Sequence, residues 1–89
     1  MEAYIQTYLE NGNLVIENIF VPNELRGQGI AKKMMQELIE NNKNIDIELH
    51  AYPQDEQTDI NKLVEFYESF GFEIIGGSED WGFEMILNN

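Results

Sequence analysis

The sequence V-P-N-E-L-R-G-Q-G-I-A-K-K-M-M-Q-E-L-I, residues 21 to 39, joins a predicted strand to a predicted helix through a glycine-rich loop. Pro22 ends the apolar run before it, because proline has no N–H for a strand ladder. Gly27 and Gly29 allow the loop a positive φ and leave its backbone N–H groups open. Apolar residues then recur at helical spacing, at Ile30, Met34 and Leu38. We therefore predict a helix from Gln28 to Asn41 that begins at the glycines.

The start of this helix is a predicted site for a phosphate-bearing ligand. Free N–H groups and the positive end of the helix dipole favour anions there. The chain has only five basic residues, and Arg26, Lys32 and Lys33 are three of them. The P-loop pattern G-x-x-x-x-G-K-S/T is absent, and the dinucleotide fingerprint lacks its third glycine, which Lys32 replaces. A nucleotide-binding module is therefore the weaker interpretation.

Length and composition set the outer limits. The 89 residues are expected to form a single domain, residues 1–89. The absence of cysteine excludes disulfides, thiolate zinc sites and a cysteine acyl-enzyme, and a single histidine argues against a metal site. The net charge of −12 argues against nucleic acid as a direct partner and favours a cationic one, although acidity that only confers solubility explains it equally well. With no membrane span or signal peptide in the pattern, we expect a cytoplasmic protein.

The other elements follow from hydrophobic periodicity and turn signals. Strands are expected at Ala3–Glu10, Leu14–Val21, Ile45–Tyr52, Phe72–Ile75 and Trp81–Leu87, with a second helix capped by Thr58 or Asp59 and ended by Gly71. The turn Asn11-Gly12-Asn13 predicts an antiparallel hairpin, and a right-handed strand–helix–strand crossover predicts one parallel pair.

Two details of these strands are further expectations. Glu17 and Asn18 are the only polar residues of an apolar strand, so at least one of them should be buried if that strand is central. The last two strands should turn at Gly76-Gly77, with Trp81 on the same face as Phe83.

The loop sequence R-G-Q-G-I-A, Arg26 to Ala31, fits the pattern Q/R-x-x-G-x-G/A, and at this point the chain resembles the GCN5-related N-acetyltransferase (GNAT) family. The resemblance implies an α/β fold with a mixed central sheet in the order β-β-α-β-α-β-β, without the family's usual N-terminal strand and helices. The sheet face they would cover is then expected to be closed by a second copy of the chain or by the substrate. In the family this loop wraps the pyrophosphate of acetyl-CoA. The expected cofactor residues are Phe20, Val21, Arg26, Gly27, Gln28, Gly29, Ile30, Ala31, Lys32 and Lys33.

Two further stretches carry the resemblance. F-Y-E-S-F-G-F, Phe66 to Phe72, is similar to an aromatic helix end whose tyrosine lies near the acetyl sulfur, and Tyr67 takes that position; core packing explains the same aromatics on spacing alone. A-Y-P-Q-D, Ala51 to Asp55, resembles a small group of short phage-encoded acetyltransferases that includes an anti-CRISPR protein, which would place the chain in a host cytoplasm.

The implied activity is N-acetyl transfer from acetyl-CoA, without a metal, to a cationic amine, either a protein lysine or a small molecule. Direct attack by the amine is simpler than an acyl-enzyme in a chain without cysteine. Tyr67 would protonate the leaving thiolate, and Glu17, His50 or Glu48 would take the amine proton. An ordinary strand histidine is an equally good reading of His50.

The pantetheine arm is expected to lie against the backbone of Phe20 and Val21, where the two parallel strands would splay at Pro22, and one backbone N–H there could polarise the thioester carbonyl. The alternative function is a non-catalytic acidic protein that occupies a basic surface of a partner.

Overall fold

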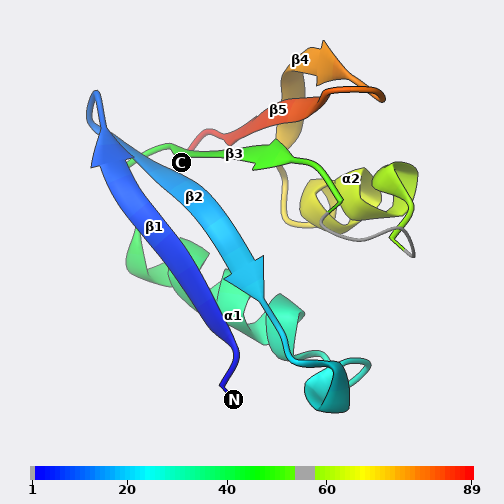
Figure 1. The fold of residues 1–89 in the computed structure, drawn as a ribbon. Helices are drawn as coiled ribbons and strands as arrows, with labels where there is room; N and C mark the ends of the chain where they lie inside the picture. Colours follow the sequence, from blue (N-terminus) through cyan, green and yellow to red (C-terminus); the bar gives the residue numbers. More distant parts are fainter. Residues whose placement is uncertain (1, 54–57) are drawn as a thin grey trace.

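The computed structural model describes residues 2–53 and 58–89, and its elements follow the predicted order (Figure 1). Of the A-Y-P-Q-D stretch, residues 54 and 55 lie outside the described part. The elements are β1 (Tyr4–Glu10), β2 (Asn13–Phe20), the 3₁₀ turn η1 (Asn23–Leu25), α1 (Ile30–Asn41), β3 (Ile47–Ala51), α2 (Ile60–Glu68), β4 (Glu73–Ser78) and β5 (Gly82–Leu87). The order β-β-α-β-α-β-β and the α/β class are confirmed; the short turn η1 was not predicted.

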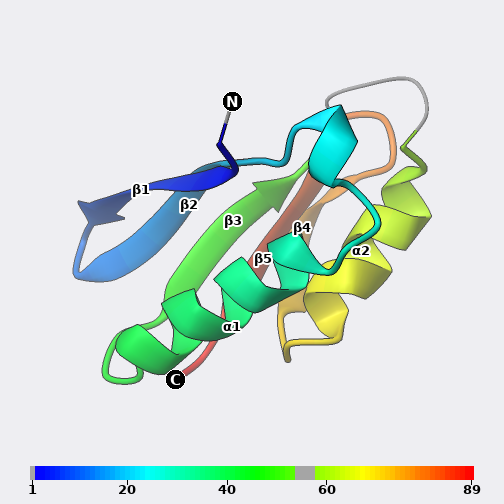
Figure 2. The same ribbon diagram turned by 90° about the horizontal axis from the view of Figure 1, so that it is seen from below.

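The five strands form one mixed sheet in the order β1-β2-β3-β5-β4, in which β2 and β3 are parallel and the other neighbours antiparallel. Figure 2 shows both helices in front of this sheet, on one of its faces. The core lies between the two helices and the sheet. Its centre is made of fully buried side chains from α1 (Met35), β3 (Ile47) and β5 (Met85). Periodicity of 2 in the strands and 3.6 in the helices brings these apolar residues to a common layer.

The parallel strands β2 and β3 separate earlier than the sequence suggested. They pair only from Leu14 to Ile16 and from Ile47 to Leu49. Next along β2, the register with β1 shifts between Gln6 and Thr7, so Glu17 is an extra residue on β2, a β-bulge. A bulge bends its strand and leaves backbone groups outside the ladder. The expected splay at Pro22 is therefore wrong in position, because the strands already diverge at Glu17.

The bulge also overturns the expectation that Glu17 or Asn18 is buried. Glu17 is exposed and Asn18 is half-buried, and no polar side chain of the described residues belongs to the buried core. β2 is an inner strand of the sheet, but the divergence from β3 opens the space beside these two residues. Neither side chain has to lose its contact with water.

The β4–β5 connection differs as well. Gly76 and Gly77 pair with Glu84 and Phe83 inside the ladder, next to a register shift, and the turn lies between Ser78 and Gly82. The two glycines look like a turn in sequence, but a positive φ at Gly77 also fits the irregular strand edge. Trp81 lies in the turn with 79% of its surface exposed, so it does not share the inward face of Phe83.

The second face of the sheet carries no described helix. In the described residues no helix has the length and apolar character that a bilayer crossing requires.

The open face of the sheet and the divergence of β2 from β3 are the two features of the fold that leave space for a site.

Candidate active site

A cleft of about 360 Å³ opens where β2 ends, between the N-terminus of α1 and the side of α2. Residues expected to bind acetyl-CoA line it, together with side chains of α2. Its described lining is Ile19, Val21, Leu25, Arg26, Gly27, Gly29, Ile30, Ala31, Lys32, Thr58, Leu63, Phe66 and Tyr67. The cleft therefore joins the glycine loop and Tyr67, which the sequence places almost 40 positions apart.

The polar end of this cleft is an uncapped helix terminus. Gly29 adopts the left-handed conformation with φ 75°, and Gly27 has φ 81°. α1 has no side-chain cap and no acidic residue in its first turn. Its first intrahelical bond runs from the Lys33 N–H to the Gly29 carbonyl at 3.0 Å, so the N–H groups of Ile30 and its neighbours point out of the helix. Such a terminus binds an anion such as a phosphate.

Two cations border the same place. Arg26 Nε donates a hydrogen bond to the Val21 carbonyl at 3.1 Å, which ties the loop back to the end of β2. Lys32 lines the cleft from the first turn of α1. In a chain of charge −12, these side chains concentrate positive potential at the helix terminus.

Three of the expected cofactor residues do not line the cleft. Lys33 lies a further 100° round the helix and borders a different surface hollow with Glu37 and Glu40. The Gln28 amide donates to the Glu24 carbonyl at 3.3 Å. The ring of Phe20 lies 5.3 Å from that of Tyr4, centroid to centroid.

Tyr67 is positioned by aromatic packing at the end of α2. Its ring lies 5.3 Å from Phe66 and 6.1 Å from Phe72, both in tilted or edge-on contacts. Only 8% of the residue is exposed, and burial raises the pKa of Tyr67 to about 12. The phenol is therefore protonated at neutral pH, where its O–H can donate a hydrogen bond.

The gap between β2 and β3 holds a second hollow of about 160 Å³. The three residues expected to be catalytic, Glu17, His50 and Tyr67, all line it. Tyr67 and Arg26 line both this hollow and the cleft, so the two adjoin each other. The early divergence of the strands brings the three groups together, since a ladder continued to Pro22 would have closed the space between them.

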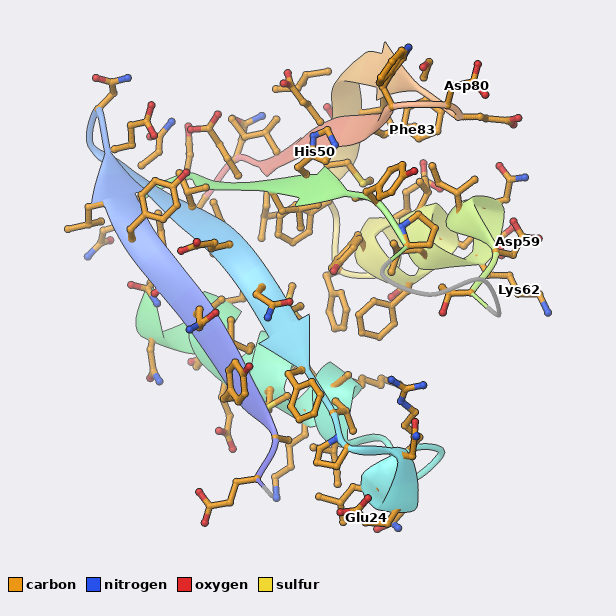
Figure 3. All side chains as sticks on the ribbon, viewed as in Figure 1. Glu24, His50, Asp59, Lys62, Asp80 and Phe83 are labelled. Atoms are coloured by element: carbon orange, nitrogen blue, oxygen red, sulfur yellow. The ribbon has the colours of Figure 1, made fainter. Side chains whose placement is uncertain are left out.

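His50 lies on the face of β3 that points away from the helices (Figure 3). Its Nε2 lies 2.8 Å from the Trp81 carbonyl oxygen, which can only accept a hydrogen bond. Nε2 must therefore carry a proton, and in the neutral ring Nδ1 keeps the lone pair that can accept one. Sequence reasoning missed both Trp81 and the adjacent Gly82.

Gly82 is needed for this arrangement. It is buried with φ 89°, and a Cβ there would overlap His50 Nε2 and lie 2.9 Å from the Ala51 carbonyl oxygen. Any other residue would push the imidazole away. The sequence signal was the W-G pair itself, but nothing in it shows that β5 brings this pair beside His50.

Comparisons with known proteins agree with this geometry. The family model described as "Acetyltransferase (GNAT) domain" matches residues 2–74. The solved structure of the anti-CRISPR protein AcrVA5 is 30% identical, covers 96% of this chain and 88% of its own, and superposes with a TM-score of 0.71. A search of curated proteins gives no significant match.

Two larger structures share the fold at lower identity. An acetyltransferase of the GNAT family from Bacteroides thetaiotaomicron is 19% identical over 99% of this chain and 55% of its own, with a TM-score of 0.77. The NatC complex bound to Gag peptide and CoA contains a chain that is 20% identical over 98% of this chain and 59% of its own, with a TM-score of 0.69. This chain thus spans less than two thirds of these two relatives.

Proposed function

The chain belongs to the GNAT acetyltransferase family, and we propose that residues 1–89 act as one minimal domain that transfers the acetyl group of acetyl-CoA to a cationic amine. The observation that carries the proposal is that the cleft at the uncapped, cationic terminus of α1 adjoins the hollow lined by Glu17, His50 and Tyr67. One end suits a diphosphate and the other suits proton transfer.

Acetyl-CoA would supply an activated acetyl thioester. The first-turn N–H groups of α1, with Arg26 and Lys32, would hold its diphosphate. The apolar side chains of Ile19 and Val21 would lie along the pantetheine arm, which places the acetyl end at the bulge. Backbone groups that the bulge at Glu17 leaves outside the ladder are suited to polarise the carbonyl, in place of the strand end at Phe20 and Val21 proposed from sequence.

A protonated amine must lose a proton before it attacks. Glu17 and His50 both line the hollow in which the amine would attack. The hydrogen bond from His50 Nε2 to the Trp81 carbonyl oxygen leaves the lone pair of the neutral ring on Nδ1, which can accept the amine proton. We assign the base role to His50, with Glu17 as an anionic group that attracts the amine to the hollow.

Tyr67 would act on the leaving group as a hydrogen-bond donor. A phenol with a pKa of about 12 would transfer its proton to a thiolate of ordinary pKa ~8.5 only at a cost of about 5 kcal/mol. A hydrogen bond from the phenol to the sulfur, formed as the C–S bond breaks, avoids the cost of that proton transfer. Burial thus favours stabilisation of the thiolate over full protonation.

Direct attack is also supported by the serines. The chain has no cysteine. Ser69 Oγ donates to the Phe66 carbonyl at 2.6 Å, and Ser78 Oγ accepts from the Trp81 N–H at 3.3 Å. Neither residue lines the cleft or the hollow, so neither is placed to form an acyl-enzyme.

The acceptor we propose to test first is a protein lysine, because a net charge of −12 attracts basic protein surfaces, where lysine is the side chain that bears an amine. The experiment is incubation with acetyl-CoA and a panel of lysine peptides and small amines, read as CoA release and as acetylation by mass spectrometry. Calorimetry with CoA is the parallel measurement. Release of CoA that depends on the amine is expected. A protein that binds no CoA would refute the proposal, and one that binds basic partners without CoA would instead be the acidic binder.

A further inference from the structure

The face of the sheet opposite the helices is unpartnered, and this inference about what covers it rests on the proposed function. His50 lies on this face (Figure 3), and residues from all five strands gather around it. They surround a hollow of about 340 Å³ whose described lining is Tyr8, Glu10, Val15, Ile16, Glu17, Glu48, Leu49, His50, Ile75, Glu84 and Met85. We call this the open-face hollow.

The open-face hollow is strongly anionic. Its described lining includes four glutamates and no lysine or arginine. Glu48 accepts a hydrogen bond from the Asn13 amide at 2.9 Å, a neutral donor that orients the carboxylate and leaves its charge in place. Tyr8 and Ile75, which are 45% and 56% exposed, border the hollow with apolar surface. This combination suits long side chains with an aliphatic stem and a cationic end.

The open-face hollow adjoins the hollow between β2 and β3, where the proposed function places the attack. Glu17, His50 and the strand residues beneath them line both it and the hollow between β2 and β3. A side chain that enters from the open face therefore reaches Tyr67 from the side opposite the cleft for acetyl-CoA. Such an approach keeps the anionic acceptor surface and the cationic diphosphate site on different faces of the sheet.

We propose that the open face docks a basic segment of another protein, which crosses the strands in an extended conformation and inserts one lysine between β2 and β3. Five strands at a spacing of about 4.8 Å make a surface about 19 Å across, which an extended segment of about six residues spans. A single small amine would use only the opening at Glu17 and His50, and would leave Glu10 and Glu84 without a ligand.

A second copy of the chain is a poor occupant of this face. Each copy carries a net charge of −12 and would bring the same glutamates against one another. Like charges brought together at an interface disfavour association. Complementary charge therefore selects a basic partner.

The test uses the full chain loaded with CoA, so that binding is measured without chemistry. The probe is a ten-residue peptide with one central lysine flanked by arginines, and the matched peptide has glutamine in place of arginine. The variant Glu10→Gln/Glu84→Gln changes the open face, and Glu37→Gln/Glu68→Gln makes the same change of net charge on the helices. None of these four residues belongs to the proposed catalytic or CoA-binding groups.

We expect calorimetry to show tenfold or greater weakening for the open-face variant, less than twofold for the helix variant, and loss of affinity as salt rises from low to 0.3 M. Equal weakening by the two variants would overturn the inference, as would equal affinity for the arginine and glutamine peptides. A dimer in solution that dissociates when Glu10 and Glu84 are changed would assign the face to a second copy instead. In a parallel incubation with acetyl-CoA in place of CoA, peptide binding without CoA release would refute the proposed function while supporting the docking surface.

Discussion

Lys32 and Lys33 provide the sharpest test of the donor site. They are adjacent, exposed and equal in charge, but only Lys32 lines the cleft. A lysine about 5 Å from a diphosphate with two charges gains ~1.7 kcal/mol in water, of which screening leaves about 1 kcal/mol. Lys33, about one helix diameter further away, retains only ~0.1 kcal/mol at 0.1 M salt. Lys32→Gln should therefore weaken CoA binding roughly fivefold to tenfold, and Lys33→Gln less than twofold.

Calorimetric titration with CoA at 0.1 M salt measures this difference directly. Pantetheine, which lacks the diphosphate, is the control ligand and should bind the wild type and both variants alike. Equal losses for the two variants would mean that CoA senses only net charge, and the assignment of the diphosphate to the α1 terminus would then be wrong. A loss confined to Lys33→Gln would place the ligand on the opposite side of α1.

Three further outcomes are expected. Tyr67→Phe should lower kcat roughly 10- to 100-fold, as for loss of a hydrogen bond to a charged leaving group, with CoA affinity within twofold of wild type; equal losses in both would remove its role in the reaction. Gly82→Ala should shift the NMR signals of His50, the sole histidine, and lower kcat without changing CoA binding, and in a His50→Ala background it should cause no further loss of rate. The folded pKa of Tyr67, about 12, lies above its unfolded value of 10.0. The protonated phenol should therefore contribute about 2.7 kcal/mol to the free energy of unfolding below pH ~10, and this contribution should be lost as the pH rises toward 12. Chemical denaturation of the wild type should show this decline in unfolding free energy, and Tyr67→Phe should lack that component.

The fold was predictable because its signals are local. Pro22, the asparagine–glycine turn and the helical spacing after Gly29 each act through a few neighbouring residues, and they fixed the order of the elements. Asp59 caps α2 as expected, accepting a hydrogen bond from the Asn61 N–H at 2.8 Å. The helix α1 begins at Ile30, two residues later than predicted, because both glycines keep a positive φ.

The site was predictable only in part. The glycine loop and Tyr67 follow from motifs, but the bulge at Glu17 depends on the register between β1 and β2, which alternation of polar and apolar residues does not specify. The contact of Trp81 and Gly82 with His50 depends on pairing between β3 and β5, more than 30 positions apart in sequence. Such non-local pairing leaves no periodic trace.

The short ladder between β2 and β3 also determines where the sheet opens locally. Only three ladder pairs join β2 to β3, with one side-chain hydrogen bond from Asn13 to Glu48 beside them, so we expect local opening of the described sheet along this line. A coenzyme seated across this line would touch both halves, and every kcal/mol of its affinity for the closed form would slow amide exchange in the hairpin. The affinity for the coenzyme and the protection of the hairpin amides against exchange would then report the same free energy.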